Sequence, residues 1–345
     1  MKDRLLWLAL MAAVIPAGCH QVTEFGSVYN SRLTFIRTSD LQVEKTMDGF
    51  ELGRLLAGGG PGKLIIIASD GVLNRIDMAQ MAVDTSYSIG GSSGTGYSDA
   101  ATATNGSLYV LGPGSQVLEV DLATDAVAPG FTPGADPVAI AASPALPRLY
   151  FADAAGAYIG EIWTADNHTG FNAGLQSAPA DIMVEPAGGK HVVVVCSDQQ
   201  GSIYDLWLDY SAEYPRKLPI EAGSPCSRVQ PLGIDSCFAI ACPQWSGDNG
   251  YICLARGYVD PETVELTTEP VEGHPVDMCF NPSIGYAGML SVLSRTDAGN
   301  TVVTVFGFTQ SYLDPEPEAV IELNGFPRDI ISPGNGEYII VLTSE

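Results

Sequence analysis

Three aspartates stand at the same place in a phrase that recurs along the chain, two residues after a proline and inside a short apolar run. They are Asp181, Asp277 and Asp329, and Asp99 opens a run of the same kind. Carboxylate oxygens are the ligands that a hard cation such as Ca²⁺ prefers, so aspartates that converge from repeated units could hold one. The competing interpretation is that each carboxylate accepts hydrogen bonds from backbone N–H groups of a neighbouring turn. We favour this structural role and predict no metal site, because another repeat carries Ala139 at the equivalent position.

Two further places carry side chains that suit binding or catalysis. His274 stands at the start of the apolar run that contains Asp277 and could point into a channel, although a lone histidine is more often structural. Trp245 and Asp248 lie in the stretch 243–250, where an aromatic ring beside a carboxylate suits contact with a sugar or a peptide, although a plain hairpin loop is the simpler interpretation. The sequence contains no GxSxG, HExxH or CxxCH motif. It therefore predicts no catalytic residue and no bound cofactor.

The stretch 134–166 shows the repeated unit to which these residues belong. It predicts three short strands, at 137–142, 148–152 and 158–163, each rich in β-branched, aromatic or small apolar residues and bounded by turn-forming residues. The prolines that open this phrase in successive copies are 42, 96 and 52 residues apart, so the middle interval holds two units. Units of about 40–50 residues with four strands each are typical of β-propeller blades.

The two ends of the chain predict how the ring of blades closes. Residues 31–38 and 41–47 predict two strands with no inner pair before them, and residues 326–332 and 338–343 predict an inner pair with no outer strands after it. When the N-terminal outer strands pair with the C-terminal inner strands, they complete one blade and leave no gap in the ring. Six further blades lie between the ends. We therefore predict an all-β fold, a seven-bladed propeller of four-stranded antiparallel blades, with six or eight blades as alternatives.

Composition excludes one class of partner. The chain has 345 residues, of which 46% are hydrophobic, enough for a sizeable core. Its 16 basic and 40 acidic residues give a net charge of −24, and no basic run occurs. Nucleic acids require clustered lysine and arginine to neutralise phosphates, so we expect no nucleic-acid partner. The acidity is most simply explained by solubility.

The N-terminus predicts export. Lys2 and Arg4 precede an apolar run at 5–15 that is too short to span a bilayer as a stable helix. The run ends in the segment 16–19 (PAGC), which resembles the lipobox of bacterial lipoproteins, with proline where leucine is usual. The resemblance implies that Cys19 is lipidated and becomes the new N-terminus. Ordinary secretion with cleavage shortly before this cysteine is the alternative.

The same resemblance implies a cellular localisation and a domain organisation. His20 follows Cys19 where an aspartate would imply retention at the inner membrane, so the sorting rule favours the outer membrane. We predict a signal peptide at 1–19, a short tether at 20–30 and a single propeller domain at 31–345.

Six cysteines remain after Cys19, all in one part of the chain. They are Cys196, Cys226, Cys237, Cys242, Cys253 and Cys279. An even number in an exported chain fits disulfide pairing, although six cysteines allow fifteen connectivities. Cys242 and Cys253 flank one predicted hairpin, and Cys226 and Cys237 flank another candidate turn. We predict these two pairs, and no structural zinc site, because the matching CxxC and histidine spacing is absent.

Four segments carry a more specific pattern. They are 108–111 (LYVL), 117–124 (VLEVDLAT), 137–144 (PVAIAASP) and 149–153 (LYFAD). These segments resemble the inner, second and third strands of the YVTN family of seven-bladed propellers, although the tetrapeptide that names the family is absent. Related propellers include surface-layer proteins, lactonases, quinone-dependent dehydrogenases and the haem d1 domain, and a shared fold does not choose among them.

The sequence favours a non-enzymatic module, anchored by lipid at the cell envelope, that binds a protein or a glycan or serves as a scaffold. The alternative is a lactonase-like hydrolase with His274 and Asp277 at the channel mouth, with a divalent cation as an optional cofactor. A third interpretation, a structural role in a surface layer, would require self-association.

Overall fold

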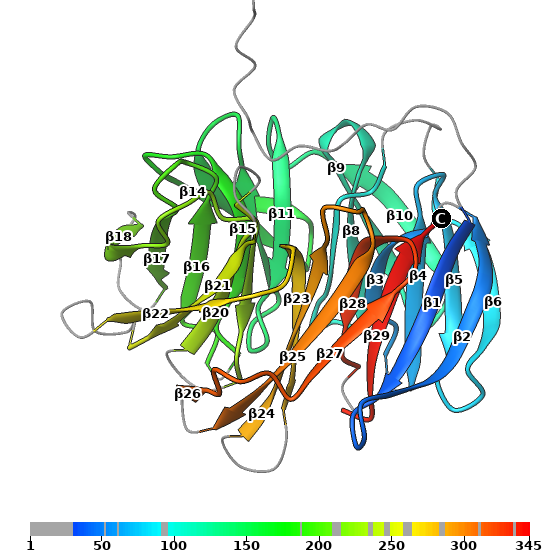
Figure 1. Cartoon of the computed structure of the whole chain (residues 1–345). Coiled ribbons are helices and arrows are strands. Elements are labelled where there is room, and N and C mark those ends of the chain that lie inside the picture. Colours follow the sequence, from blue (N-terminus) through cyan, green and yellow to red (C-terminus); the bar gives the residue numbers. More distant parts are fainter. Residues whose placement is uncertain are drawn as a thin grey trace, which may run out of the picture.

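The computed structural model describes residues 30–345 except 52, 61, 91–95, 187, 209–214, 234–236, 245–248, 258–263, 283–286, 310–311 and 334–335. Seven antiparallel sheets stand side by side in a ring and form a β-propeller (Figure 1). The predicted fold class, blade number and strand number are therefore confirmed. Among the described residues, no helix has the length and apolar character needed to cross a membrane.

Blades are numbered from the first complete sheet, and each is given from its inner to its outer strand. Blade one contains β3 (Gly53–Gly58), β4 (Lys63–Ala68), β5 (Val72–Asp77) and β6 (Ala82–Ser88). Blade two contains β7 (Asp99–Thr102), β8 (Ser107–Gly112), β9 (Gln116–Asp121) and β10 (Ala126–Phe131), with a 3₁₀ turn at Pro113–Ser115. Blade three contains β11 (Pro137–Ala142), β12 (Arg148–Asp153), β13 (Tyr158–Trp163) and β14 (His168–Gly174).

The second half of the ring follows the same order. Blade four contains β15 (Pro179–Val184), β16 (His191–Cys196), β17 (Ser202–Trp207) and β18 (Arg216–Glu221). Blade five contains β19 (Arg228–Pro231), β20 (Cys237–Cys242), β21 (Tyr251–Arg256) and β22 (Glu265–Pro270). Blade six contains β23 (His274–Pro282), β24 (Ala287–Arg295), β25 (Thr301–Thr309), β26 (Tyr312–Leu313) and β27 (Ala319–Leu323).

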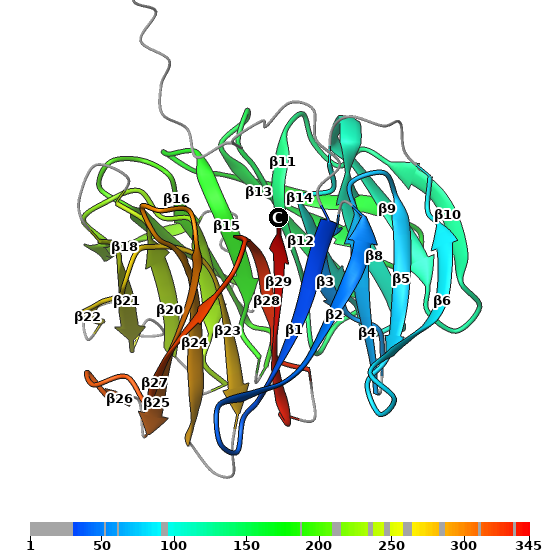
Figure 2. The ribbon, with the colours of Figure 1, turned by 45° about the vertical axis from the view of Figure 1, so that its right-hand side comes forward.

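Blade seven joins the two ends of the propeller. Its inner strands are β28 (Phe326–Ile331) and β29 (Tyr338–Ser344), and its outer strands are β1 (Asn30–Arg37) and β2 (Gln42–Glu51). β1 pairs with β29 from Ser31 opposite Ser344 to Arg37 opposite Tyr338. Figure 2 shows these four strands in one sheet. The predicted closure is therefore confirmed, and seven backbone pairs join the N-terminal and C-terminal strands.

Apolar packing between blades holds the ring together. Each of the seven core clusters formed by the described residues combines side chains of two neighbouring blades. The strands β8, β16 and β20 are buried along their whole length, whereas the outer strands β6 and β22 contain only exposed and half-buried residues. Burying a Val, Leu or Ile side chain contributes about 1.5–3 kcal/mol, so these interfaces supply most of the driving force.

Blade six departs from the regular pattern. The second and third strands of blades one to five have six residues each, whereas β24 and β25 have nine. Three additional residues lengthen a strand by about 10 Å. The extension carries the short strand β26, which pairs with the end of β25, and it projects at the lower left of Figure 1. The sequence did not predict this extension.

Candidate functional site

One position of each inner strand forms a ring around the propeller axis, which we call the axial belt. In blades one to five its members pair with the fifth residue of the second strand. In five blades the residue follows a one-residue bulge, which turns the strand locally. The belt consists, in blade order, of Leu55, Asp99, Ala139, Asp181, Arg228, Asp277 and Asp329. The four predicted aspartates therefore share one level of the fold.

Each aspartate of the axial belt ties its blade to the next blade around the ring. One carboxylate oxygen accepts a hydrogen bond from a backbone N–H that immediately follows the belt position of that next blade. The donors are Ile140 to Asp99 at 2.7 Å, Val229 to Asp181 at 2.8 Å, Ile330 to Asp277 at 3.1 Å and Leu56 to Asp329 at 2.6 Å. The aspartates thus accept backbone hydrogen bonds, and the donors lie in neighbouring inner strands rather than in turns.

The second carboxylate oxygens also face donors. Asp99 accepts from the N–H of Ala100 at 2.9 Å, and Asp329 accepts from the N–H of Ile330 at 2.8 Å. For Asp181 and Asp277 the facing donor is a guanidinium. Arg228 Nη1 lies 3.8 Å from Asp181 Oδ1, and Arg228 Nε lies 3.5 Å from Asp277 Oδ1. Arg228 therefore supplies the positive charge that a bound cation would otherwise bring.

The five charged members of the belt line a cavity of about 350 Å³ to which all seven blades contribute residues. The side chain of Arg228 is 27% exposed, and it is among the residues that line this cavity. Within the part of the chain that the structure describes, no group of three or more His, Cys, Asp or Glu side chains is arranged to hold a metal ion. The carboxylate oxygens of the belt contact backbone N–H groups and Arg228. This arrangement connects neighbouring blades.

Burial alters the protonation of the belt. Desolvation raises the pKa of Asp181 to about 7, against the opposing charge of Arg228. Desolvation likewise raises the pKa of Asp99, and it raises that of Asp329 well above the usual range with help from the neighbouring Asp277. Although desolvation opposes its charge, the surrounding aspartates raise the pKa of Arg228. The belt therefore retains protons near neutral pH and keeps one fixed positive charge.

The other predicted site residues lie elsewhere. His274 begins β23, is buried, and is not among the residues that line the cavity. Its Nδ1 lies 2.7 Å from the carbonyl oxygen of Pro243, and its Nε2 lies 3.1 Å from Asp297 Oδ1. Asp277 lines the cavity and His274 does not, so the two residues predicted as a hydrolytic pair do not share one site. Trp245, Asp248 and Cys19 lie outside the described residues.

Sequence reasoning missed Arg228. The Pro-x-Asp phrase that identified the aspartates is absent before β19, where the corresponding segment reads SRV. One signal in the sequence could have identified Arg228. It begins the inner strand of its blade, and the inner strands of the two neighbouring blades carry Asp181 and Asp277 at the same position. A basic residue at the repeat position of an otherwise acidic set indicates internal charge compensation.

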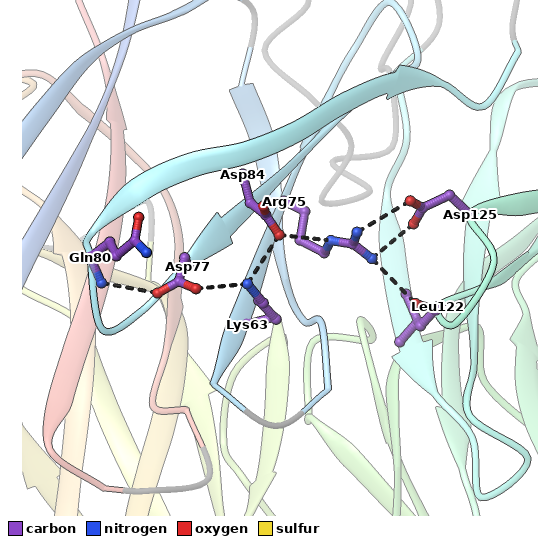
Figure 3. Close-up of polar contacts among 7 residues, drawn as sticks. All are labelled: Lys63, Arg75, Asp77, Gln80, Asp84, Leu122 and Asp125. Carbon is purple, nitrogen blue, oxygen red and sulfur yellow. Dashed lines mark hydrogen bonds and ion pairs between the residues drawn. The ribbon is translucent and has the colours of Figure 1, made fainter.

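A second set of contacts ties blades together near the rim. Arg75 of β5 donates to both carboxylate oxygens of Asp125, at 2.9 and 3.2 Å, and to the carbonyl oxygen of Leu122 (Figure 3). In the next blade, Asn167 donates to Glu119 at 3.1 Å. Asp125 and Asn167 occupy the same turn position between third and fourth strands, with φ of 58° and 55°. These residues tolerate the left-handed conformation well, which explains their use in this turn.

Lys63 links two further acids of blade one. Its Nζ lies 2.8 Å from Asp77 and 3.0 Å from Asp84, and Asp77 also accepts from the N–H of Gln80 (Figure 3). The hydrogen bond to Lys63, followed by that to Gln80, lowers the pKa of Asp77. These surface pairs are solvated, so each contributes little to stability.

The predicted pair of Cys226 and Cys237 is wrong, and the predicted pair of Cys242 and Cys253 is not joined by a disulfide bond. All six described cysteines are free and buried. Cys242 and Cys253 do face each other, with 3.9 Å between their sulfur atoms. Cys226 packs with these two between blades four and five, whereas Cys237 belongs to the core between blades five and six. The linker before β19 turns Cys226 toward blade four, so no hairpin brings it to Cys237.

Comparisons with known proteins support the fold. No protein-family model matches the sequence, and no curated protein is similar to it in sequence. Among solved structures, the chain is similar to hydrazine synthase of Kuenenia stuttgartiensis (TM-score 0.66, 13% identity, 85% of this chain and 95% of that chain). It is also similar to U3-55K (0.65, 12%, 90% and 98%) and to the WD40 repeats of RRP9 (0.65, 12%, 91% and 100%). At these identities the likeness establishes the propeller fold alone.

Proposed function

We propose that this chain is a non-enzymatic, lipid-anchored propeller of the cell envelope that binds a protein partner through the extension of blade six. Propellers of the WD40 type are among its structural neighbours, and a rigid disc with variable loops suits protein recognition. The lipid anchor at Cys19 and the outer-membrane address rest on the sequence pattern alone. Glycan binding relied on Trp245 and Asp248, which the structure does not describe.

The blade-six extension is the observation that carries the proposal. Tyr312 is 63% exposed, the highest value among the large hydrophobic side chains of the described chain. Its strand neighbour Leu313 is buried in the core and anchors the segment. The guanidinium of Arg256 lies 4.5 Å from the centre of the Tyr312 ring and fixes its orientation. Tyrosine and arginine are enriched at protein interfaces, where rigid aromatic side chains serve as anchors.

Charge indicates the chemistry of the partner. The segment after Tyr312 reads LDPEPE, and its residues 314–318 are all exposed. Glu265, which pairs with Arg256 at 3.1 Å, adds a further exposed carboxylate beside the ring. With a net charge of −24 on the whole chain, this surface would attract a protein that presents lysine and arginine around an apolar contact.

Site-specific photocrosslinking in the source organism tests the proposal. A photoreactive amino acid replaces Tyr312 in one variant and Val83 in a matched control, because Val83 is 45% exposed on the outer strand of blade one. We expect one basic protein to crosslink in near-stoichiometric amount to position 312 and not to position 83. The Asp314→Lys exchange should reduce the yield several-fold. Equal crosslinking at both positions, or none at 312, would refute the proposed surface.

The anchor is tested separately. Metabolic labelling with an alkyne fatty acid should label the wild-type chain, and Cys19→Ser should remove the label and release the protein from membranes. Labelling that persists in Cys19→Ser would contradict the lipidation prediction without affecting the test of blade six.

A further inference from the structure

The guanidinium of Arg228 has hydrogen-bonding capacity that the described chain does not use. It carries five N–H groups. The closest contacts, 3.5 Å to Asp277 and 3.8 Å to Asp181, are longer than the usual N–H···O distance of about 2.7–3.2 Å. Among the described residues, no other side chain pairs with this guanidinium, and it makes no hydrogen bond. The axial cavity is therefore lined by a positive group that can still donate to an oxygen of a ligand.

Two acids of the axial belt lack a cationic partner. Asp99 belongs to blade two and Asp329 to blade seven, on either side of blade one. Each accepts one backbone N–H group at each oxygen, whereas an ionised carboxylate has about four acceptor positions. Neither forms an ion pair with a cationic side chain of the described chain, in contrast to Asp181 and Asp277. Both side chains belong to half-buried residues that line the cavity, so a ligand can reach them.

The rest of the cavity wall indicates the size and class of the ligand. Aliphatic residues line it, among them Leu56, Ile140 and Met278, and no aromatic residue of the described chain does so. A flat ring would therefore find no aromatic face on which to stack. The volume of about 350 Å³ lies near the lower end of the range for small-ligand pockets, about 300–1,000 Å³. The wall thus suits a small molecule with an aliphatic part.

We propose that the axial cavity binds a free aliphatic α-amino acid as its zwitterion. The carboxylate of the ligand accepts hydrogen bonds from Arg228, and its ammonium group donates to Asp99 and Asp329. The aliphatic side chain of the ligand packs on the apolar part of the wall. Binding is non-covalent. The site lies on the propeller axis, away from the extension of blade six, so it does not depend on the proposed protein partner.

Charge balance favours a zwitterion over either of its halves. A simple carboxylate would meet Arg228, but it would also be repelled by the four aspartates of the belt, which outnumber the single cation. A simple amine would meet Asp99 and Asp329, but it would leave the guanidinium of Arg228 without an acceptor. A zwitterion brings no net charge and offers both groups at once. Its hydrogen bonds to ionised side chains are of the stronger, charge-assisted kind.

Binding should release protons. Desolvation raises the pKa of Asp99, and it raises that of Asp329 well above its usual range, so both retain protons before a cation arrives. The other charged groups that face them across the cavity are Asp181, Asp277 and Arg228. An ammonium group stabilises the ionised form of a nearby carboxylate and therefore displaces its proton. Proton release distinguishes recognition of the ammonium group from binding through the carboxylate alone.

Calorimetric titration of the purified full chain tests the proposal. The probes are L-alanine, L-valine and L-leucine, together with isoamylamine, which is leucine without its carboxylate, and isocaproate, which is leucine without its amino group. We expect at least one amino acid to bind at one site per chain, with L-leucine at least tenfold tighter than either analogue. Heats measured in buffers of different ionisation enthalpy should show proton release. No saturable binding of any amino acid up to about 10 mM, or equal affinity for L-leucine and one analogue, would overturn the proposal.

Two variants separate the two ends of the ligand. Asp99→Asn keeps an acceptor for the N–H of Ile140 but cannot pair with an ammonium group, so it should weaken L-leucine at least tenfold and leave isocaproate unchanged. Arg228→Lys keeps the charge but loses the planar pair of donors, so it should weaken L-leucine and leave isoamylamine unchanged. Asp125→Asn, at the rim, is the matched control and should bind as the wild type does.

The wild-type titration is the primary measurement, so a variant that fails to fold leaves the test intact. Wild-type affinity for L-leucine in a folded Asp99→Asn variant would contradict the proposed place of the ammonium group.

Discussion

The axial belt and the three cysteines between blades four and five, Cys226, Cys242 and Cys253, both bury titratable side chains, but they compensate for burial in different ways. The belt surrounds oxygen acids with backbone N–H groups and one guanidinium, so each of its carboxylate oxygens has a partner within the chain. The cysteines place their sulfur atoms in an apolar core, where Cys242 and Cys253 face each other at 3.9 Å and Cys226 faces a backbone carbonyl. The comparison indicates that the belt joins blades through polar contacts, whereas these cysteines join them through apolar packing.

Loss of the single cation should have the largest effect on the belt. Arg228→Leu leaves Asp181 and Asp277 without their positive partner, and removal of one member of a buried ionic set costs about 3–5 kcal/mol. We expect the free energy of unfolding at pH 7 to fall by that amount in urea titrations. Arg37→Leu is the control, because Arg37 pairs with Asp40 and Glu44 at the solvated surface, so its loss should cost far less than that of Arg228. Similar losses in the two variants would show that the belt needs no internal cation.

The pH dependence of stability should reveal the protons of the belt. The pKa of Asp181 is about 7 in the folded chain and about 4 in an unfolded one, so the folded state binds a proton that the unfolded state releases between these values. The contribution of Asp181 to the free energy of unfolding should therefore fall by about 4 kcal/mol as the pH rises from 4 to 8. The raised pKa values of Asp99 and Asp329 act in the same direction.

The matched variant for this prediction is Asp181→Asn, which keeps an oxygen for the N–H of Val229 but does not titrate. The difference in unfolding free energy between wild type and variant should change steadily across this range. A difference that is independent of pH would exclude a protonated Asp181.

Each carboxylate should also contribute through its backbone hydrogen bond. Asp99→Ala leaves the N–H of Ile140 without its acceptor, and an unsatisfied buried donor costs about 1–3 kcal/mol. Asp99→Asn should recover most of that loss in thermal or urea unfolding. If alanine and asparagine are equally destabilising, the charge of Asp99 matters more than its hydrogen bond.

The smallest effect is expected at the rim. Asparagine adopts the left-handed conformation of Asp125 as readily as aspartate does, so Asp125→Asn preserves the turn. The exchange removes the charge that faces Arg75, whose side chain is 17% exposed. We expect a loss of about 1 kcal/mol or less, which salt should reduce further. A loss as large as that of Arg228→Leu would overturn the distinction between axis and rim.

Much of the architecture could be predicted because blades repeat a local pattern. Strand alternation and turn residues identified the repeated strands, and the ranges 137–142, 148–152 and 158–163 correspond to β11, β12 and β13. Closure through β1 and β29 followed from unmatched strands at the two ends. The extension of blade six was missed although its interval of 52 residues is the longest of the repeat, because the spacing does not say whether added residues lengthen strands or loops.

The sequence by itself determined the ring, its closure and the equivalence of the four aspartates, since these depend on alternation and spacing along the chain. Only the tertiary structure decided what those aspartates contact, because each partner N–H belongs to the next blade and is distant in sequence. It also placed Arg228 among them and gathered Cys226 with Cys242 and Cys253 rather than with Cys237. Side chains that meet between blades are chosen by packing of neighbouring sheets, which no periodicity within one strand records.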